Sequence, residues 1–478
     1  MLFNSINFAF FLPIVFVFYW FVTNKSLKLQ NILLLAASYF FYACWDWRFL
    51  FLLIFSTFLD YFTGVKMAES KKPSLKKFWF WLSISINLGF LGIFKYYDFF
   101  ATSLAETLSD FGFQANFWTL KILLPVGISF YTFHGLSYVI DIYKNRIVPE
   151  KDIVSYSLFV SYFPLLVAGP IERATHLLPQ VKKKRVFNYN QAIDGIYQII
   201  WGLFKKVVIA DSCAHYANEI FDNYENMNSL SLLLGACYFA FQIYGDFSGY
   251  SDIALGTSKL FGIDLLRNFN FPYFSRDIAE FWRRWHISLS SWFRDYLYIP
   301  LGGSKGGMWM KIRNTFIIFI VSGFWHGANW TFIVWGALNA VYFLPLLIKN
   351  KNRDHIEIVA KGQTFPSLKD FSNILITFIM TVFAWIFFRS PTVKDALLYI
   401  KRIFSFNFEG KVQYLSFERY TVELLLLLFV FVFLEWISRE NEHPILGRYK
   451  TAKAVMICIA IIVFGTFSEK SNFIYFQF

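Results

Sequence analysis

One histidine, His326, lies deep inside an apolar stretch of the sequence, within the segment Trp325–Trp330. Arg313 marks the inner edge of that span, thirteen residues earlier. At about 1.5 Å per residue, His326 lies roughly 20 Å deeper, past the midpoint of a hydrocarbon core of about 30 Å unless the helix tilts. An ionisable side chain at that depth is costly unless it faces a cavity or a partner, so His326 is a candidate catalytic residue. The alternative is a structural histidine, hydrogen-bonded between helices.

A neutral imidazole at this depth could act as general base on a hydroxyl group. Trp325 would help to exclude bulk water from the reaction, and Asn329 could orient a substrate or His326 itself. Both residues are therefore predicted to bind substrate.

A second histidine, His286, lies in a segment that can be tested as a helix, Phe281–Tyr298. At about 100° per residue, His286 and most of the aromatic residues fall on one arc, and most of the charged and hydroxyl residues fall on the other. This pattern predicts an amphipathic helix in or near the cytoplasmic interface, ended by Pro300 and the glycines that follow it. His286 is the second candidate catalytic residue. Its alternative is an interfacial histidine that packs like an aromatic residue.

Basic residues are frequent in and after this predicted helix. Arg283 and Arg284, with Trp285 beside them, are the predicted substrate-binding residues of the segment. Such residues could receive a phosphorylated donor such as coenzyme A, although the excess of positive charge on cytoplasmic loops explains them without any ligand. The basic residues of this stretch are Arg283, Arg284, Arg294, Lys305, Lys311 and Arg313.

Two acidic residues, Asp246 and Asp252, end another apolar run. They could orient a histidine or pair with a cytoplasmic arginine, and a structural ion pair is the favoured interpretation. The four cysteines are scattered, so their spacing indicates neither a disulfide framework nor a metal site. No glycine-rich phosphate loop, serine nucleophile elbow or zinc-protease motif is present.

The composition places these residues in a membrane. Hydrophobic residues make up 56% and charged residues 16% of the 478 residues, and the mean hydropathy is +0.45. A soluble chain this apolar would lack the polar surface to cover itself. We predict an all-α polytopic protein with about 11–13 transmembrane or re-entrant helices. The candidate spans are 7–23, 31–45, 48–65, 78–97, 122–142, 154–169, 191–210, 231–247, 314–345 (one long helix or two broken around Gly327), 372–388, 420–437 and 453–468.

The net charge of +13 fits basic cytoplasmic loops better than nucleic-acid binding. Loops that alternate between basic and non-basic place the N-terminus outside, with a retained first span. We expect one membrane domain over 1–478. Its predicted parts are N-terminal helices (1–120), a catalytic core (121–348) with a cytoplasmic segment (262–313), and C-terminal helices (349–478).

Several motifs together resemble the membrane-bound O-acyltransferase family, and most closely its bacterial alginate O-acetyltransferase branch. The resemblance covers essentially the whole chain. The motifs are Asp246–Asp252, Phe281–Ser290, Trp292–Gly303, Trp325–Gly327 and the ending Phe473–Phe478.

The resemblance implies that His326 matches the family's intramembrane catalytic histidine and His286 its second signature histidine. It implies acetyl-CoA as cytoplasmic acyl-donor substrate, with no bound cofactor, and an extracytoplasmic polysaccharide as the polymer acetylated. A separate periplasmic or extracellular acetyltransferase of the SGNH type is the expected partner, besides membrane lipids. The expected location is the bacterial inner membrane.

Three rival functions remain at this stage. The D-alanyl transfer branch, which serves teichoic acids, shares the family core. A transporter or flippase could use His326 to bind a substrate without reacting, although no internal repeat is evident in the sequence. A purely structural scaffold for a soluble partner is the last alternative.

Overall fold

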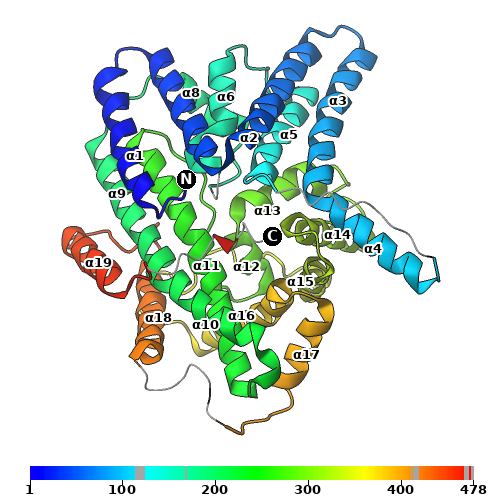
Figure 1. Ribbon diagram of the computed structural model, residues 1–478, viewed down its shortest axis with the longest axis vertical. Coiled ribbons are helices and arrows are strands. Elements are labelled where there is room, and N and C mark those ends of the chain that lie inside the picture. The colour runs from blue at the N-terminus through cyan, green and yellow to red at the C-terminus, as the bar shows by residue number, and fades with distance from the viewer. Residues whose placement is uncertain (114–123, 167–168, 411, 413–418, 468–472, 475–478) are drawn as a thin grey trace. The chain divides into compact units, whose positions relative to one another are not determined.

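The structure, a computed structural model, describes residues 1–478 except 114–123, 167–168, 411, 413–418, 468–472 and 475–478. The described residues form helices and no strand, as the sequence predicted (Figure 1). Within the described part of the chain, five helices are long and apolar enough to cross a membrane, as a multi-pass membrane protein requires. These helices are Leu27–Glu69, Pro73–Asp110, Ser229–Leu260, Trp330–Ile348 and Leu368–Arg389, with shorter apolar helices at Ile6–Val22 and Ile153–Leu166.

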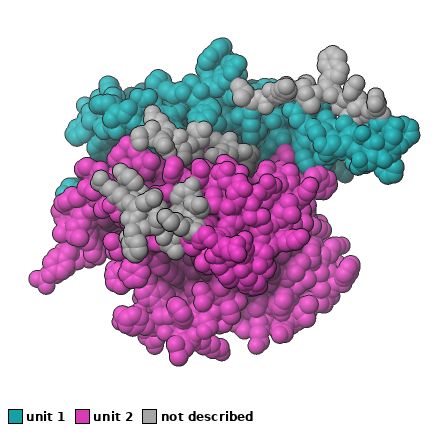
Figure 2. Space-filling model, turned by 60° about the horizontal axis from the view of Figure 1, so that its bottom comes forward, with its two compact units in different colours: residues 1–196, 254–266 teal, residues 197–253, 267–478 magenta. Residues whose placement is uncertain are grey.

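Contacts between residues divide the chain into two compact units, coloured separately in Figure 2. The first comprises residues 1–196 and 254–266, and the second comprises 197–253 and 267–478. The three parts expected from sequence, like the single domain over 1–478, stay predictions.

The first unit is organised around the long helix α2 (Leu27–Glu69), which packs against α3, α5 and α6. Asp46 interrupts α2 with extended backbone angles, φ −154° and ψ 111°, in the gap between the predicted spans 31–45 and 48–65. The unit's other elements are α1 (Ile6–Val17), η1 (Phe18–Val22), α3 (Pro73–Leu91), η2 (Gly92–Tyr96), α4 (Tyr97–Asp110), α5 (Ile128–Tyr143), α6 (Ile153–Ser161), α7 (Phe163–Leu166), α8 (Ala174–Lys182) and the first half of α9 (Tyr189–Leu203).

The second unit holds every predicted site residue. It contains the end of α9 and most of α11 (Ser229–Leu260). Its other elements are η3 (Phe204–Ala210), α10 (Asp211–Asp222), η4 (Tyr224–Asn226), η5 (Pro272–Phe274), α12 (Ile278–Arg284), α13 (Ile287–Phe293), η6 (Arg294–Tyr298), α14 (Met308–His326), α15 (Trp330–Ile348), α16 (Leu368–Arg389), α17 (Val393–Ile403), α18 (Arg419–Ser438) and α19 (Lys450–Phe464).

The segment 314–345 forms two helices, α14 and α15, which separate after His326. Asn329 begins α15 as its N-cap, because its side-chain oxygen accepts a hydrogen bond from the Thr331 N–H at 3.0 Å. The helices pack closely where Gly323 faces the Phe332 carbonyl, a place that a Cβ atom would overlap. The break therefore leaves His326 at the end of a tightly packed hairpin.

The single helix expected over Phe281–Tyr298 is divided in two, which corrects the prediction. Backbone φ is +43° at His286, in the left-handed region, and this residue separates α12 from α13. Arg284, expected on the solvent-facing side, is buried with 7% of its surface exposed. The periodicity was misleading because Arg284, on the predicted polar side, is buried like Trp285 on the predicted apolar side. The predicted end holds, since η6 stops at Tyr298, before Pro300.

Candidate functional site

His326 is the last residue of α14, and only 4% of its surface is exposed. Its imidazole centroid lies 5.2 Å from that of Trp335 and 5.3 Å from that of Phe388. Trp335 belongs to α15 and Phe388 to α16, so three helices enclose the ring. An apolar shell of this kind keeps bulk water away from the imidazole.

His286 lies at the junction of α12 and α13 and is 1% exposed. Its ring packs edge-on against Phe247 of α11, at 4.7 Å between centroids. Burial lowers the pKa of His286 to about 3, so the ring is neutral at physiological pH. Neither ring nitrogen has a hydrogen-bond partner among the described residues. A buried neutral imidazole in this state offers one donor and one acceptor to a substrate.

Trp325 connects the two histidines. Its indole lies 4.8 Å from the ring of His326 and 5.9 Å from the ring of His286, between centroids. The structure thus brings both predicted catalytic residues against one aromatic side chain, although they come from separate segments of the chain.

Trp285, predicted to bind substrate, is 1% exposed and belongs to the aromatic core. Its ring lies 5.0 Å from Trp385 of α16, and Trp385 stacks at 5.5 Å on Trp335. Trp335 in turn contacts His326. Trp285 therefore belongs to a continuous set of aromatic rings that reaches His326.

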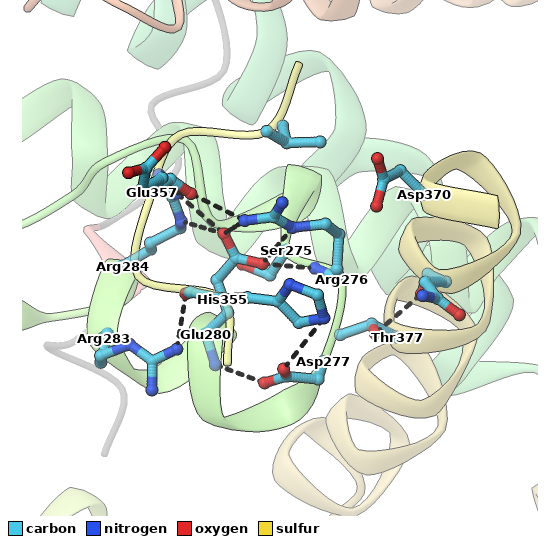
Figure 3. A network of polar contacts seen from close by, with 12 residues as sticks. Ser275, Arg276, Asp277, Glu280, Arg283, Arg284, His355, Glu357, Asp370 and Thr377 are labelled. Atoms are coloured by element: carbon cyan, nitrogen blue, oxygen red, sulfur yellow. Dashed lines mark hydrogen bonds and ion pairs between the residues drawn. The ribbon is translucent and has the colours of Figure 1, made fainter. Parts of the chain in front are cut away.

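Arg284 and Arg276 both bind one buried carboxylate, that of Glu280 (Figure 3). The nearest nitrogen–oxygen distance is 2.8 Å from Arg284, and the Arg276 Nε lies at 3.0 Å. Both guanidinium groups also donate to the Glu357 carbonyl, at 2.7 Å from Arg276 and 3.2 Å from Arg284. Arg284, predicted to bind substrate, thus has several protein partners in this structure.

Arg283 donates to two carbonyls of the connection between α15 and α16. Its terminal nitrogens lie 2.7 Å from the Asn352 oxygen and 2.8 Å from the His355 oxygen. Asn329, besides capping α15, donates from its amide nitrogen to the Pro391 carbonyl at 2.9 Å. Both polar groups are occupied by backbone, and substrate binding by Arg283 and Asn329 stays a prediction.

A cavity of about 470 Å³ lies against α13, η6, α14 and α15, and we call it the basic pocket. Three cations line it: Arg294, Lys311 and Arg353. Arg294 pairs with Asp295 at 2.8 Å, whereas Lys311 and Arg353 have no ion pair among the described residues. The other lining residues are Ser290, Tyr298, Ser304, Thr315, Ile318, Phe319, Phe343, Leu347, Asn350 and Asn352.

The basic pocket is connected to His326 through two tryptophans. Phe319 lines the pocket and contacts Trp282 at 5.5 Å between centroids. Trp282 lies 5.6 Å from Trp335, which borders His326. Polar and cationic groups at the pocket are thus linked by aromatic rings to the buried imidazole.

Sequence reasoning missed two lysines that neutralise the acidic pair. Lys206 lies between Asp246 and Asp211, at 2.8 and 2.7 Å, and Lys205 binds Asp252 at 2.5 Å. Asp246 and Asp252 therefore form ion pairs, as favoured, but with lysines of η3. Two adjacent lysines within the apolar span 191–210 were the available signal, because such charges rarely lie in a span without partners.

The ending of the chain contributes to this cluster. The Ile474 N–H donates to the second carboxylate oxygen of Asp246 at 2.7 Å. Phe473 is fully buried, and its ring lies 4.5 Å from Tyr250. The rest of the predicted motif, residues 475–478, lies outside the described residues.

Comparisons with known proteins agree with these motifs. The family model of MBOAT, membrane-bound O-acyltransferase family, matches residues 144–388, which include every predicted site residue. The chain is 34% identical to the peptidoglycan O-acetyltransferase of Helicobacter pylori, over 99% of this chain and 90% of that protein. It is 38% identical to the probable alginate O-acetylase AlgI of Pseudomonas aeruginosa, over 85% of this chain and 75% of that protein.

A more distant similarity involves the teichoic acid D-alanyltransferase of Bacillus subtilis. Identity is 29%, over 45% of this chain and 57% of that protein.

Proposed function

Because the chain belongs to the membrane-bound O-acyltransferase family and is an acyltransferase, we propose that it moves acetyl groups from cytoplasmic acetyl-CoA to an extracytoplasmic polysaccharide. The observation that carries the proposal is that the rings of His286 and His326 both lie close to the indole of Trp325 in a buried aromatic site. We assign His326 and His286 as the catalytic residues and Trp325 and Trp285 as part of the wall around the substrates.

His326 acts as general base in the proposed reaction. It takes the proton of an acceptor hydroxyl while the hydroxyl oxygen attacks the thioester carbonyl carbon. A carbon–oxygen bond forms, the carbon–sulfur bond breaks, and the thiolate leaves and takes up the proton from His326. The aromatic shell of Trp335 and Phe388 limits competing hydrolysis, because water cannot reach the thioester freely.

The basic pocket is the proposed entrance for the donor. Phosphate groups of coenzyme A would be bound by Lys311 and Arg353, whose charges have no ion pair among the described residues. The apolar side of the pocket, which includes Phe319, would cover the uncharged arm that carries the thioester. No resident cofactor is needed for this transfer.

The acceptor belongs to the cell envelope in this proposal. The similar proteins named above act, by their names, on peptidoglycan and alginate. We propose a cell-wall polymer or an alginate-like exopolysaccharide as the final acceptor. The chain would lie in the bacterial inner membrane and work with an SGNH-type acetyltransferase on the outer side.

Acetyl content of the envelope polymer tests the catalytic assignment. Cells would carry the wild type, His326→Ala, His286→Ala or His215→Ala, at matched amounts of protein in the membrane. His215 is exposed on α10 and serves as the matched control. We expect acetylation to be lost in His326→Ala and His286→Ala and to be unchanged in His215→Ala. Unchanged acetylation with His326→Ala would refute the role of His326 as general base and would favour a transporter or scaffold function.

D-alanyl transfer is the second candidate, supported by the distant similarity to the teichoic acid D-alanyltransferase. Membranes supplied in turn with acetyl-CoA and with a D-alanyl thioester on a carrier protein separate the two. Transfer of radiolabelled D-alanine, with no transfer of acetate, would replace the acetyl donor in our proposal.

A further inference from the structure

The connection between α15 and α16, residues 349–367, has no helix and is held in place by arginine side chains; we call it the strap. Its early part is bound by three arginines of the segment around α12: Arg276, Arg283 and Arg284. Its later part is bound by Arg439, which donates to the carbonyls of Val359 and Gln363. Guanidinium-to-carbonyl hydrogen bonds thus hold both parts of the strap, and the Trp436 indole N–H adds a hydrogen bond to the Thr364 carbonyl at 2.7 Å.

The early part of the strap forms one wall of the basic pocket, through Asn350, Asn352 and Arg353. The two carbonyls that Arg283 binds, those of Asn352 and His355, lie on either side of Arg353 in the sequence. Fixing both carbonyls fixes the backbone from which the Arg353 side chain projects. Figure 3 shows Arg283 reaching His355.

The strap is also fixed at Glu357, two residues after His355. Arg276 and Arg284 are themselves fixed by the buried carboxylate of Glu280 and both donate to the Glu357 carbonyl (Figure 3). One carboxylate balances only one of these two positive charges. The carbonyl of Glu357 accepts hydrogen bonds from both guanidinium groups, which ties the strap to α12.

We propose that Arg283 is a positioning residue for the acyl donor: it holds the strap so that Arg353 faces the phosphate groups of the donor in the basic pocket. The inference rests on the donor site proposed above. It assigns Arg283 an indirect role, because both its terminal nitrogens already bind backbone oxygens.

The two roles predict different responses to lysine. A residue that binds phosphate by charge is partly replaced by lysine, which keeps the charge. Lysine cannot replace an arginine whose planar guanidinium group bridges two carbonyls, because the lysine ammonium group lacks that geometry. Arg283→Lys and Arg283→Gln should therefore behave alike.

The test measures binding of coenzyme A to the full-length protein in detergent. The variants are Arg283→Gln, Arg283→Lys, Arg353→Gln, the double variant Arg283→Gln with Arg353→Gln, and Arg448→Gln as control. Arg448 is exposed, does not line the basic pocket and lies outside the strap. We expect each Arg283 variant and Arg353→Gln to weaken binding by roughly three- to tenfold, about 0.7–1.4 kcal/mol. The double variant should bind no more weakly than Arg353→Gln alone, and Arg448→Gln should bind like the wild type.

A second measurement follows the strap without any ligand. Trypsin cleaves after the strap residues Lys351 and Arg353, and we expect several-fold faster cleavage there in Arg283→Gln than in the wild type or in Arg448→Gln. Unchanged cleavage, full binding by Arg283→Lys, or additive losses in the double variant would each overturn the inference. If Arg353→Gln weakens binding and Arg283→Gln does not, only the positioning role fails. If the wild type binds no coenzyme A, the proposed donor fails and the inference falls with it.

Discussion

The imidazole of His286 and the indole of Trp325 lie 5.9 Å apart between ring centroids, and that same indole contacts His326 at 4.8 Å. His286 comes from a loop between two short helices and Trp325 from the end of α14. Both histidines are almost fully buried. A change at Trp325 therefore alters the surroundings of both candidate catalytic groups at once.

Trp325→Ala should lower acetyl transfer by roughly 100-fold, because a misplaced catalytic group loses the geometry that the reaction needs. Trp325→Phe, which keeps an aromatic ring, should retain far more activity. The measurement compares transferred acetate with free acetate from radiolabelled acetyl-CoA, and the free fraction should rise in Trp325→Ala because water enters. Trp309, 77% exposed, provides the control Trp309→Ala. Equal activity in Trp325→Ala and the control would contradict this role.

Lys205→Met should destabilise the protein by about 3–5 kcal/mol, because the substitution leaves Asp252, whose side chain is only 15% exposed, without its cation. The double variant Lys205→Met with Asp252→Asn should recover part of this loss, since no unpaired charge remains. Thermal unfolding in detergent, followed by tryptophan fluorescence, reports the difference. A double variant less stable than Lys205→Met would show that the charge of Asp252 is not the cause.

Gly249→Ala should destabilise the second unit by about 1–3 kcal/mol through overpacking. A Cβ atom at Gly249 would lie 2.7 Å from the Gly202 carbonyl oxygen, and backbone cannot move away as a flexible side chain can. Gly89→Ala in α3 is the matched control, because nothing lies within 4 Å of its Cβ position. Helix propensity predicts that the control is neutral or stabilising by up to about 1 kcal/mol. Equal melting temperatures for the two variants would refute the close approach.

His176 should make the stability of the first unit depend on pH. The hydrogen bond that the His176 Nδ1–H donates to the Glu172 carboxylate, at 2.8 Å, raises the pKa of His176 above its ordinary value, and the charges of Glu172 and Asp264 act in the same direction. The stabilisation is therefore fully present below pH about 6.5 and is lost as pH rises through the raised pKa. The melting temperature of His176→Gln should lie below that of the wild type at pH 5.5 and approach it at pH 8.5. The His176 side chain is 37% exposed, so a small difference is expected. A gap that widens with rising pH would contradict the sign.

The apolar runs of the sequence were enough to predict most helices, because burial in hydrocarbon needs about 20 apolar residues in a row. The interruptions at Asp46 and after His326 were also visible, since charged residues and glycine break such runs. Predicting His326 required only its depth within one span. These are local properties of the chain.

The surroundings of His286 could not be predicted in the same way. Its left-handed backbone interrupts a segment whose periodicity favours one helix. The Asn268 carbonyl accepts a hydrogen bond from the Ile287 N–H at 2.8 Å, and the Asn270 N–H donates to the Arg284 carbonyl at 3.0 Å. The segment before α12 therefore stabilises the interruption between the two helices. Helical periodicity reports only neighbours within the same segment.

The sequence by itself determined the fold class, the membrane character and the two candidate histidines. Only the tertiary structure decided that both histidines contact Trp325, that Arg283 binds the strap, and that Lys205 neutralises Asp252. His286 and Trp325, Arg283 and Asn352, and Lys205 and Asp252 are each more than thirty positions apart in the sequence. Hydropathy and periodicity carry no information about which distant side chains meet, because packing across segments decides it.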